Sequence, residues 1–187
     1  MGMSLSRTEW TAEMLNTLPD DGQRYEIIDG ELFVTPMPAL VHQRAAVELS
    51  DVVRPYAKAL KLDFFSSPID ITFSDRRVLQ PDLSVLPRTR DGKLAKEFTD
   101  VGVLLLAVEV LSPSSLRTDR REKRWVYQQE RVEEYWIVDT EARMFERWTP
   151  TATEPQVLRQ SLSWQPLVAH EPLIVDLVQY FRDVLDE

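Results

Sequence analysis

The chain has 187 residues, of which 43% are hydrophobic and 28% are charged, as is usual for a soluble globular protein. It contains no cysteine, which excludes disulfides, thiolate catalysis and cysteine-based zinc sites. The formal net charge of −9 argues against nucleic-acid binding by bulk attraction, although a locally positive face remains compatible with it. Since no apolar run is long enough to cross a bilayer, we expect a single cytoplasmic domain.

A β-hairpin is predicted over residues 24–35, because Asp29-Gly30 is a favoured two-residue turn of type I′. Strand alternation gives this hairpin one wholly apolar face, which we expect to cover the core and which consists of Tyr25, Ile27, Leu32 and Val34. Glu31 lies on the opposite face beside the turn, where a carboxylate is most often solvated.

Residues 38–61 have the apolar spacing of an amphipathic helix, in which Pro55 is expected to cause a kink or a restart. His42 lies on the apolar side of this helix, where a histidine is more often a satisfied interior side chain than a ligand. Residues 62–74 then alternate between apolar and polar side chains, which predicts a half-buried strand.

Two apolar runs of strand length follow, at residues 79–85 and 104–111, and each carries one carboxylate in its interior. A buried carboxylate without a partner is rare and costly, so we predict adjacent strands that direct Asp82 and Glu109 at one shared site. Such a site suits Mg²⁺ or Mn²⁺, and the backbone carbonyl of Val110 would add a further ligand. The alternative is that both are strand-end carboxylates pointing into water.

A helix is predicted over residues 116–131, directly after the Glu109 strand. The side that is expected to face the sheet includes Leu116, Val126 and Tyr127. The same side carries Asp119 and Lys123 inward, where the Lys123 amine would orient a water and stabilise a transition state. Alternatively, Lys123 extends to solvent or pairs with Asp119. The other side of the helix carries a row of arginines: Arg117, Arg121 and Arg124. The sequence does not decide whether this row contacts phosphate or is a solvated face.

Buried strands are predicted at residues 134–139 and 144–148, a weak strand at 156–158 and a closing helix at 173–185. The strand that contains Tyr135 and Trp136, together with the apolar tail, offers a surface for a homodimer.

Taken together, several of these segments resemble the Uma-type family of restriction endonucleases, which belongs to the PD-(D/E)XK nuclease superfamily. The matching motifs are residues 25–32 with His42, Pro81-Asp82, residues 109–114, Asp119-x-x-x-Lys123-x-x-x-Tyr127 and residues 134–139. They cover about residues 24–148, and residues 149–187 would add a strand and a helix to the same domain, which spans residues 1–187.

The resemblance implies an α/β fold of mixed α+β type, with a restriction-endonuclease-like core. In that core a central mixed β-sheet is flanked by helices and preceded by an N-terminal β-hairpin. Asp82 and Glu109 would be its metal ligands, and Glu31 and His42 would be auxiliary site residues. Leu111 stands where the superfamily has its motif lysine, and the family resemblance implies that this role has moved to Lys123 on the following helix.

The residues by themselves indicate a divalent metal and phosphoryl-type hydrolysis, and the resemblance adds DNA as the substrate. We therefore expect a Mg²⁺- or Mn²⁺-dependent endonuclease that hydrolyses DNA phosphodiester bonds. The alternative is a catalytically inactive member of the fold that binds a protein or a nucleic acid, which the acidic charge and Leu111 favour. An enzyme acting on a small phosphorylated substrate is disfavoured, because the chain has five glycines and no glycine-rich phosphate loop.

Overall fold

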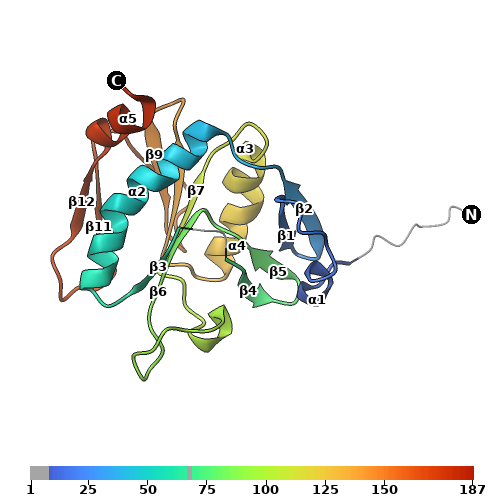
Figure 1. Cartoon of the computed structure of the whole chain (residues 1–187). Coiled ribbons are helices and arrows are strands. Elements are labelled where there is room, and N and C mark those ends of the chain that lie inside the picture. Colours follow the sequence, from blue (N-terminus) through green and yellow to red (C-terminus); the bar gives the residue numbers. More distant parts are fainter. Residues whose placement is uncertain (1–8, 67–68) are drawn as a thin grey trace, which may run out of the picture.

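A six-stranded mixed β-sheet lies at the centre of the computed structural model, which describes residues 9–66 and 69–187 (Figure 1). From one edge to the other, its strands are β10 (Gln156–Leu158), β9 (Met144–Trp148), β8 (Glu134–Asp139), β7 (Leu106–Val110), β6 (Leu83–Leu86) and β3 (Asp63–Phe65). β7 and β8 are parallel, and the other neighbours are antiparallel. Every residue of β7 is buried, as expected for a central strand covered on both faces.

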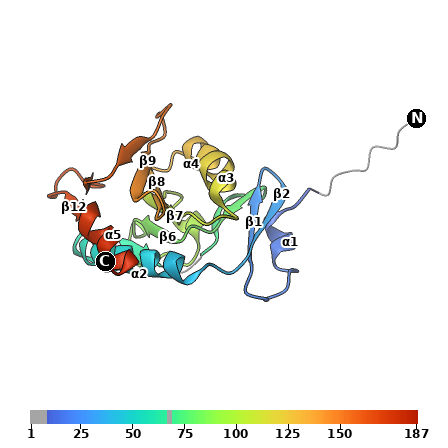
Figure 2. The ribbon, with the colours of Figure 1, turned by 90° about the horizontal axis from the view of Figure 1, so that it is seen from above.

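A second, four-stranded antiparallel sheet lies beside the first (Figure 2). In spatial order, its strands are β2 (Glu31–Thr35), β1 (Arg24–Ile28), β5 (Arg77–Leu79) and β4 (Ile71–Ser74). The short helix α1 (Ala12–Leu15) is attached to this sheet, because the Ala12 N–H donates to the Asp75 carbonyl at 2.8 Å. A third sheet pairs β11 (Ser161–Trp164) with β12 (Leu173–Asp176).

Helices cover both faces of the six-stranded sheet (Figure 2). α2 (Leu40–Ala59) and α5 (Leu177–Leu185) lie on one face. On the other face lies a helical segment made of α3 (Leu116–Thr118), a π-helical turn (Asp119–Lys123) and α4 (Arg124–Gln129). This segment connects the parallel strands β7 and β8, which can be joined only by a crossover. A short 3₁₀ helix (Phe98–Asp100) lies in the loop before β7.

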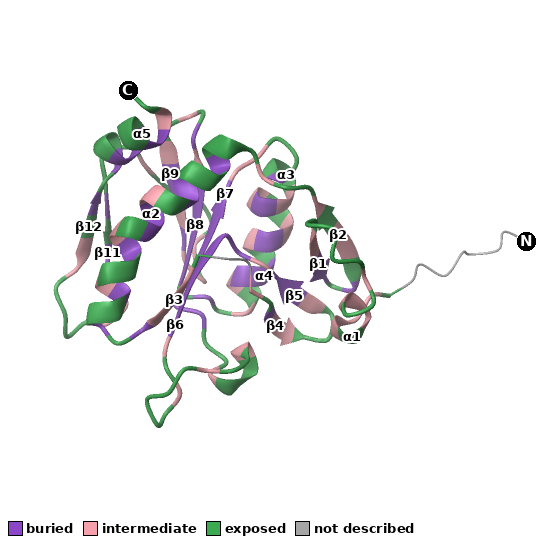
Figure 3. Cartoon of the chain, in the orientation of Figure 1, coloured by how far each residue is buried: buried purple, intermediate pink, exposed green. Residues whose placement is uncertain are grey.

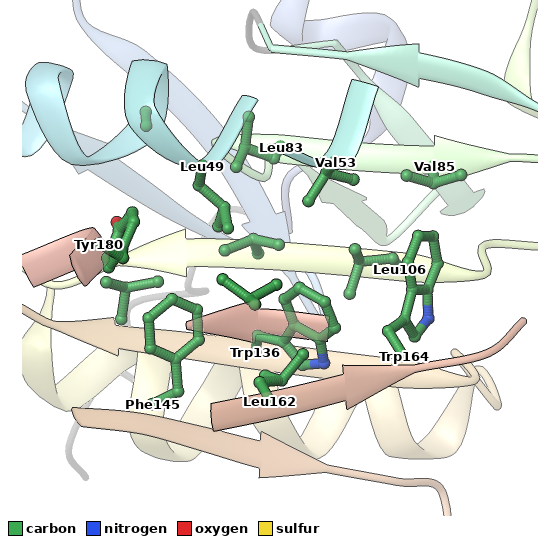
Figure 4. Close-up of a cluster of buried hydrophobic side chains, with 14 of the residues drawn as sticks. Leu49, Val53, Leu83, Val85, Leu106, Trp136, Phe145, Leu162, Trp164 and Tyr180 are labelled. Carbon is green, nitrogen blue, oxygen red and sulfur yellow. The ribbon is translucent and has the colours of Figure 1, made fainter. Parts of the chain in front are cut away.

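Two hydrophobic clusters fill the spaces between the sheet and its helices, and Figure 3 shows that burial is concentrated in the strands between the helical layers. On the α2 side, Leu49 and Val53 of the helix pack with Trp136 and Phe145 of the sheet (Figure 4). The cluster on the α4 side includes Tyr127 and Tyr135, whose ring centroids are 4.6 Å apart.

Several elements that depend on local sequence patterns form where they are predicted. The hairpin of β1 and β2 turns at Asp29 (φ 49°) and Gly30 (φ 83°), the positive angles that a type I′ turn requires. Strands β8, β9 and β10 cover the predicted residues. α2 forms as predicted, and it continues through Pro55 as one helix, so the restart does not occur.

Two segments that the sequence predicts as single strands each contribute to two sheets. Residues 79–85 contain the end of β5 and the start of β6, with Pro81 between them, because proline has no N–H to donate to a ladder. Residues 62–74 contain β3 and β4, and residues 67 and 68 of that predicted strand lie outside the described residues. Both predictions of a continuous strand are therefore wrong.

The predicted closing helix at residues 173–185 is also wrong in its first part. Leu173–Asp176 forms β12, because these residues pair with β11, and α5 begins only at Leu177. The Asp176 carboxylate accepts the backbone N–H groups of Val178 and Gln179, both at 3.0 Å, and so caps the start of α5.

Two predicted surfaces are corrected by burial. The hairpin face that was expected to cover the core leaves Val34 47% exposed, whereas Glu26 and Ile28 on the other face are buried. Tyr135 and Trp136 are buried within the chain, so these residues are not available for a homodimer surface. None of the helices within residues 9–66 and 69–187 is long and apolar enough to span a bilayer.

Candidate active site

Asp82 and Glu109 are neighbours on adjacent strands. Leu83 of β6 pairs with Val108 of β7, and the Asp82 N–H donates to the Val108 carbonyl at 3.0 Å, which sets Asp82 beside Glu109. Side chains directly opposite each other in an antiparallel pair point to the same face of the sheet. Asp82 and Glu109 are only 3% and 2% exposed, and both line one cavity. The structure thus brings the two predicted carboxylates together on the face covered by α3 and α4.

Asp82 is fixed by three groups from three elements. Its Oδ2 accepts the Val110 backbone N–H at 2.7 Å and lies 3.1 Å from Nε2 of His42, which comes from α2. Its Oδ1 lies 2.5 Å from Nη1 of Arg24, at the start of β1. Burial raises the pKa of Asp82, but the hydrogen bond and charge of His42 and the charge of Arg24 outweigh it and lower this pKa. Asp82 is therefore held as a carboxylate.

Lys123 reaches the same cluster from the helical segment behind the strands. Its amine Nζ lies 2.8 Å from Glu26 Oε2, 3.0 Å from Glu109 Oε1 and 3.5 Å from Asp119 Oδ1. The side chain is buried, so it does not extend to solvent, and its pairing with Asp119 is the longest of the three contacts. Burial lowers the pKa of Lys123, but the charges of Glu109, Glu26 and Asp119 outweigh it and raise this pKa well above its usual value.

The helix turn that carries Lys123 has π geometry, over Asp119–Lys123. Both end residues of this turn are buried, because the turn directs their side chains toward the sheet. Tyr135 of β8 donates its hydroxyl to the Asp119 carbonyl at 3.0 Å, and Tyr127 of α4 donates to Glu109 Oε1 at 3.2 Å. The two tyrosines thereby join the turn to the strands, and π turns of this kind occur frequently at functional sites.

Negative charge is in excess in this cluster. Arg24 and Lys123 are its permanent cations, and they face four buried carboxylates: Glu26, Asp82, Glu109 and Asp119. Burial raises the pKa of Glu109 well above its usual value, against the effect of Lys123. Burial likewise raises the pKa of Asp119 to about 6. An additional cation would therefore stabilise the ionised form of these acids.

All members of this cluster except Asp119 line a cavity of about 220 Å³. The other walls are the end of β2, the loop before α2 and the loop after β7, which contribute Thr35, Pro36, Met37, Pro38, Ala39, Ser112, Pro113, Ser114 and Ser115. Cavities of about 430 and 740 Å³ are larger, but neither is lined by Asp82, Glu109 or Lys123. The smaller cavity is therefore the one in which the titratable groups converge, and it is the candidate active site.

The donors of this cavity fit a hard divalent cation. Within residues 9–66 and 69–187, no three histidine, aspartate or glutamate side chains form a ready-made metal cage. Mg²⁺ does not need one, because it is usually held by one or two carboxylates and completes its shell with water and phosphate oxygens. Asp82 and Glu109 supply two such carboxylates, Val110 lines the same cavity, and the excess negative charge favours a cation.

The predicted site residue Glu31 lies outside the cavity, whereas Glu26, which was not predicted, contacts Lys123. Glu31 is exposed at the start of β2 and does not line the cavity. It shares a hairpin face with Glu26, but it pairs with Ile28 beside the turn, at the end of the hairpin away from Arg24. Glu26, which the sequence interpretation assigned no role, is buried and contacts Lys123. The available signal was a lone carboxylate between Tyr25 and Ile27, the same feature that identified Asp82 and Glu109.

Of the predicted arginine row on the helical segment, one member packs against the rest of the fold and two are exposed. The Arg124 guanidinium lies 4.8 Å from the centroid of the Trp148 ring and donates to Gln128 Oε1 at 2.6 Å. Arg117 and Arg121 are exposed. Of the three, Arg124 therefore has a structural role in joining α4 to β9.

The fold and the carboxylate–lysine cluster define a mixed α/β protein of the restriction-endonuclease-like class. A family model named Uma2, with the description "Putative restriction endonuclease", matches residues 12–177, and the chain belongs to this family. The chain is also similar in structure to a protein from Anabaena variabilis ATCC 29413 described as a putative nuclease belonging to DUF820. The TM-score is 0.74 at 21% sequence identity, over 93% of this chain and 98% of the other. No curated protein sequence matches the chain.

Proposed function

We propose that this protein is a Mg²⁺- or Mn²⁺-dependent endonuclease that hydrolyses phosphodiester bonds of DNA. One observation carries the proposal: the Lys123 amine lies 3.0 Å from Glu109 in the cavity that Asp82 also lines. Membership of the restriction endonuclease family supports a nuclease, and DNA is the substrate that this family name indicates.

Asp82, Glu109 and the Val110 carbonyl are the groups that would hold the metal. When bound there, a divalent ion would polarise a phosphate oxygen and lower the pKa of a bound water. Asp82 contributes a ligand whose orientation is fixed, because its other contacts come from the Val110 backbone and from His42. We therefore assign His42 to positioning Asp82, as the second partner of Asp82 Oδ2.

Lys123 acts as a fixed positive charge in this proposal. Its raised pKa keeps the amine protonated, so it donates hydrogen bonds and does not accept a proton from water. From its place beside Glu109, the amine stabilises negative charge that develops on the phosphate in the transition state. Glu26 and Asp119 hold the amine there and prevent it from turning away.

A catalytically inactive binding module remains the second candidate. The observation that favours it is that Arg24 and Lys123 already pair with the two carboxylates. In that case the cluster would be a buried ion-pair network that stabilises the fold, and the protein would bind a partner through another surface.

Plasmid cleavage in Mn²⁺ separates these two functions. The wild-type protein is expected to nick or linearise supercoiled plasmid, and Asp82→Asn and Lys123→Met are each expected to reduce the rate by at least about 100-fold. Asp63→Asn is the matched control, because Asp63 is also a partly buried aspartate paired with an arginine (Arg88) but lies outside the cavity. Equal cleavage by wild type and Asp82→Asn, or none by either, contradicts the nuclease proposal.

A further inference from the structure

Arg24 occupies the one oxygen of Asp82 that a cation could take. Oδ2 of Asp82 is held by the Val110 N–H and by His42, whereas Oδ1 is held by the Arg24 guanidinium alone among the contacts described. The Arg24 side chain is 15% exposed and lines the cavity. A cation that binds Asp82 through Oδ1 therefore has to displace this guanidinium.

We propose that Arg24 is a built-in counter-ion of the metal site, which leaves Asp82 when a divalent cation binds and then pairs with a phosphate of the substrate. The inference rests on the proposed function, because it assumes that the cavity accepts a cation and a phosphate. It adds a residue that controls both events and that the family resemblance did not indicate.

Electrostatics favours this exchange. Two unit charges a few ångströms apart interact strongly when both are partly buried, so a dication and the guanidinium repel each other across Asp82. The cluster can release Arg24 because the dication replaces one positive charge with two beside Glu109 and Asp82. The guanidinium remains charged throughout, and an unpaired arginine in a cavity needs a new anion.

The position of Arg24 in its sheet permits the movement. It is the first residue of β1 and pairs with Thr35 of β2, whereas β5 pairs with Ile27 and Ile28 further along the strand. The side chain can therefore change its rotamer without disturbing the pairing of β1 with β5. The planar guanidinium fits two phosphate oxygens as well as it fits a carboxylate.

Isothermal titration of the full chain with Mn²⁺ tests the proposal without requiring cleavage. Arg24→Gln is expected to bind Mn²⁺ at least about tenfold more tightly than wild type, because it removes the competing charge. Arg88→Gln is the matched control, since Arg88 pairs with Asp63 outside the cavity and its loss should leave the Mn²⁺ affinity unchanged. Equal or weaker Mn²⁺ binding by Arg24→Gln, or no binding by either protein, overturns the proposal.

Cleavage kinetics at saturating Mn²⁺ provide the second measurement. Arg24→Gln is expected to raise KM for DNA several-fold more than it lowers kcat, because the substrate has lost a phosphate partner. A purely structural role would weaken metal binding and cleavage together, so opposite changes in the two measurements support the exchange. If Arg24→Gln binds Mn²⁺ more tightly than wild type but the wild-type protein cleaves no DNA, the counter-ion role is retained and the proposed nuclease is rejected.

If Arg24→Gln does not fold, the wild-type protein still tests the exchange by NMR. The Arg24 Nε–H signal, assigned by its loss in Arg24→Lys, is expected to shift on titration with diamagnetic Mg²⁺. A Mg²⁺-saturated protein in which this signal is unchanged overturns the proposal.

Discussion

Lys123 is a buried cation held by three carboxylates, and the stability of the cluster depends on it. Glu26 comes from the four-stranded sheet, Glu109 from the six-stranded sheet and Asp119 from the π turn, so one amine joins three parts of the fold. Removing one partner of a buried ion pair leaves an uncompensated buried charge. The resulting loss of unfolding free energy is larger than the stabilisation that the intact pair provides.

Replacing Lys123 with methionine should therefore lower the free energy of unfolding by about 3 kcal/mol at pH 7, because it leaves three buried acids without their cation. Urea denaturation in EDTA measures this change. Lys58→Met, on the exposed side of α2, is the control and should change the stability by less than about 0.5 kcal/mol. An equal effect of the two substitutions would show that Lys123 does not compensate the acids.

The pKa of Asp119 predicts a specific dependence of stability on pH. Since burial raises this pKa in the folded protein to about 6, the folded state binds the proton more tightly than the unfolded state. The resulting stabilisation is present below the unfolded pKa of 3.8 and is lost as the pH rises toward 6. In EDTA, Asp119→Asn should flatten the fall in unfolding free energy between these two pH values, as measured by urea titrations. An identical slope in variant and wild type would contradict the assignment.

Among the charged residues of the cavity, some were predictable from the sequence and others were not. Asp82, Glu109 and Lys123 are charged groups at positions that strand or helix periodicity places inside, which is why the pattern identified them. Glu26 and Arg24 were missed because the hairpin was assigned a single apolar inner face. That assignment fails because both faces of β1 are covered: the consecutive residues Glu26, Ile27 and Ile28 are all buried.

At the scale of elements, the β1–β2 hairpin positions Glu26 and Arg24 and depends on its turn. Gly30 has φ +83°, and a Cβ there would lie 3.0 Å from Arg76 Nε. Arg76 also donates to the Asp29 carbonyl at 2.9 Å, so the turn and this side chain are packed against each other.

Gly30→Ala should therefore cost about 1 kcal/mol more in unfolding free energy than Gly92→Ala. Gly92 is a matched control, because it has φ +78° but a Cβ there would meet nothing within 4 Å. The difference isolates the displacement of Arg76 from the backbone strain that both substitutions share. Urea denaturation of the two variants measures it, and equal losses of stability would contradict a packed turn.

Elements defined by neighbouring residues were predictable, whereas the membership of strands in sheets was not. The hairpin and strands β8 and β9 follow from turn chemistry and alternation, which are local. The divisions near Pro81 and within residues 62–74 depend on which distant strand each half pairs with. β12 was predicted as helix for the same reason, since its pairing with β11 overrides its helical spacing.

At the scale of the whole molecule, the net charge of −9 opposes binding to DNA, so local positive charge has to attract the substrate. In our account a bound dication supplies part of this charge and also compensates the acidic cluster. Metal binding and folding stability should therefore be linked.

Mn²⁺ at 100 times its Kd should raise the free energy of unfolding by about 2.7 kcal/mol relative to EDTA, because only the folded protein has the site. Asp82→Asn should lose this stabilisation and Asp63→Asn should keep it. Urea denaturation with and without the metal measures both. A metal effect that is the same in all three proteins would place the stabilising ion at another site.

The most direct test of the account is a crystal structure with Mn²⁺, read from its anomalous scattering. We predict one strong anomalous peak within about 2.0–2.4 Å of carboxylate oxygens of both Asp82 and Glu109. Saturating Mn²⁺ with no peak between these two carboxylates would contradict the proposed metal site, and with it the assignment of the protein as a metal-dependent nuclease.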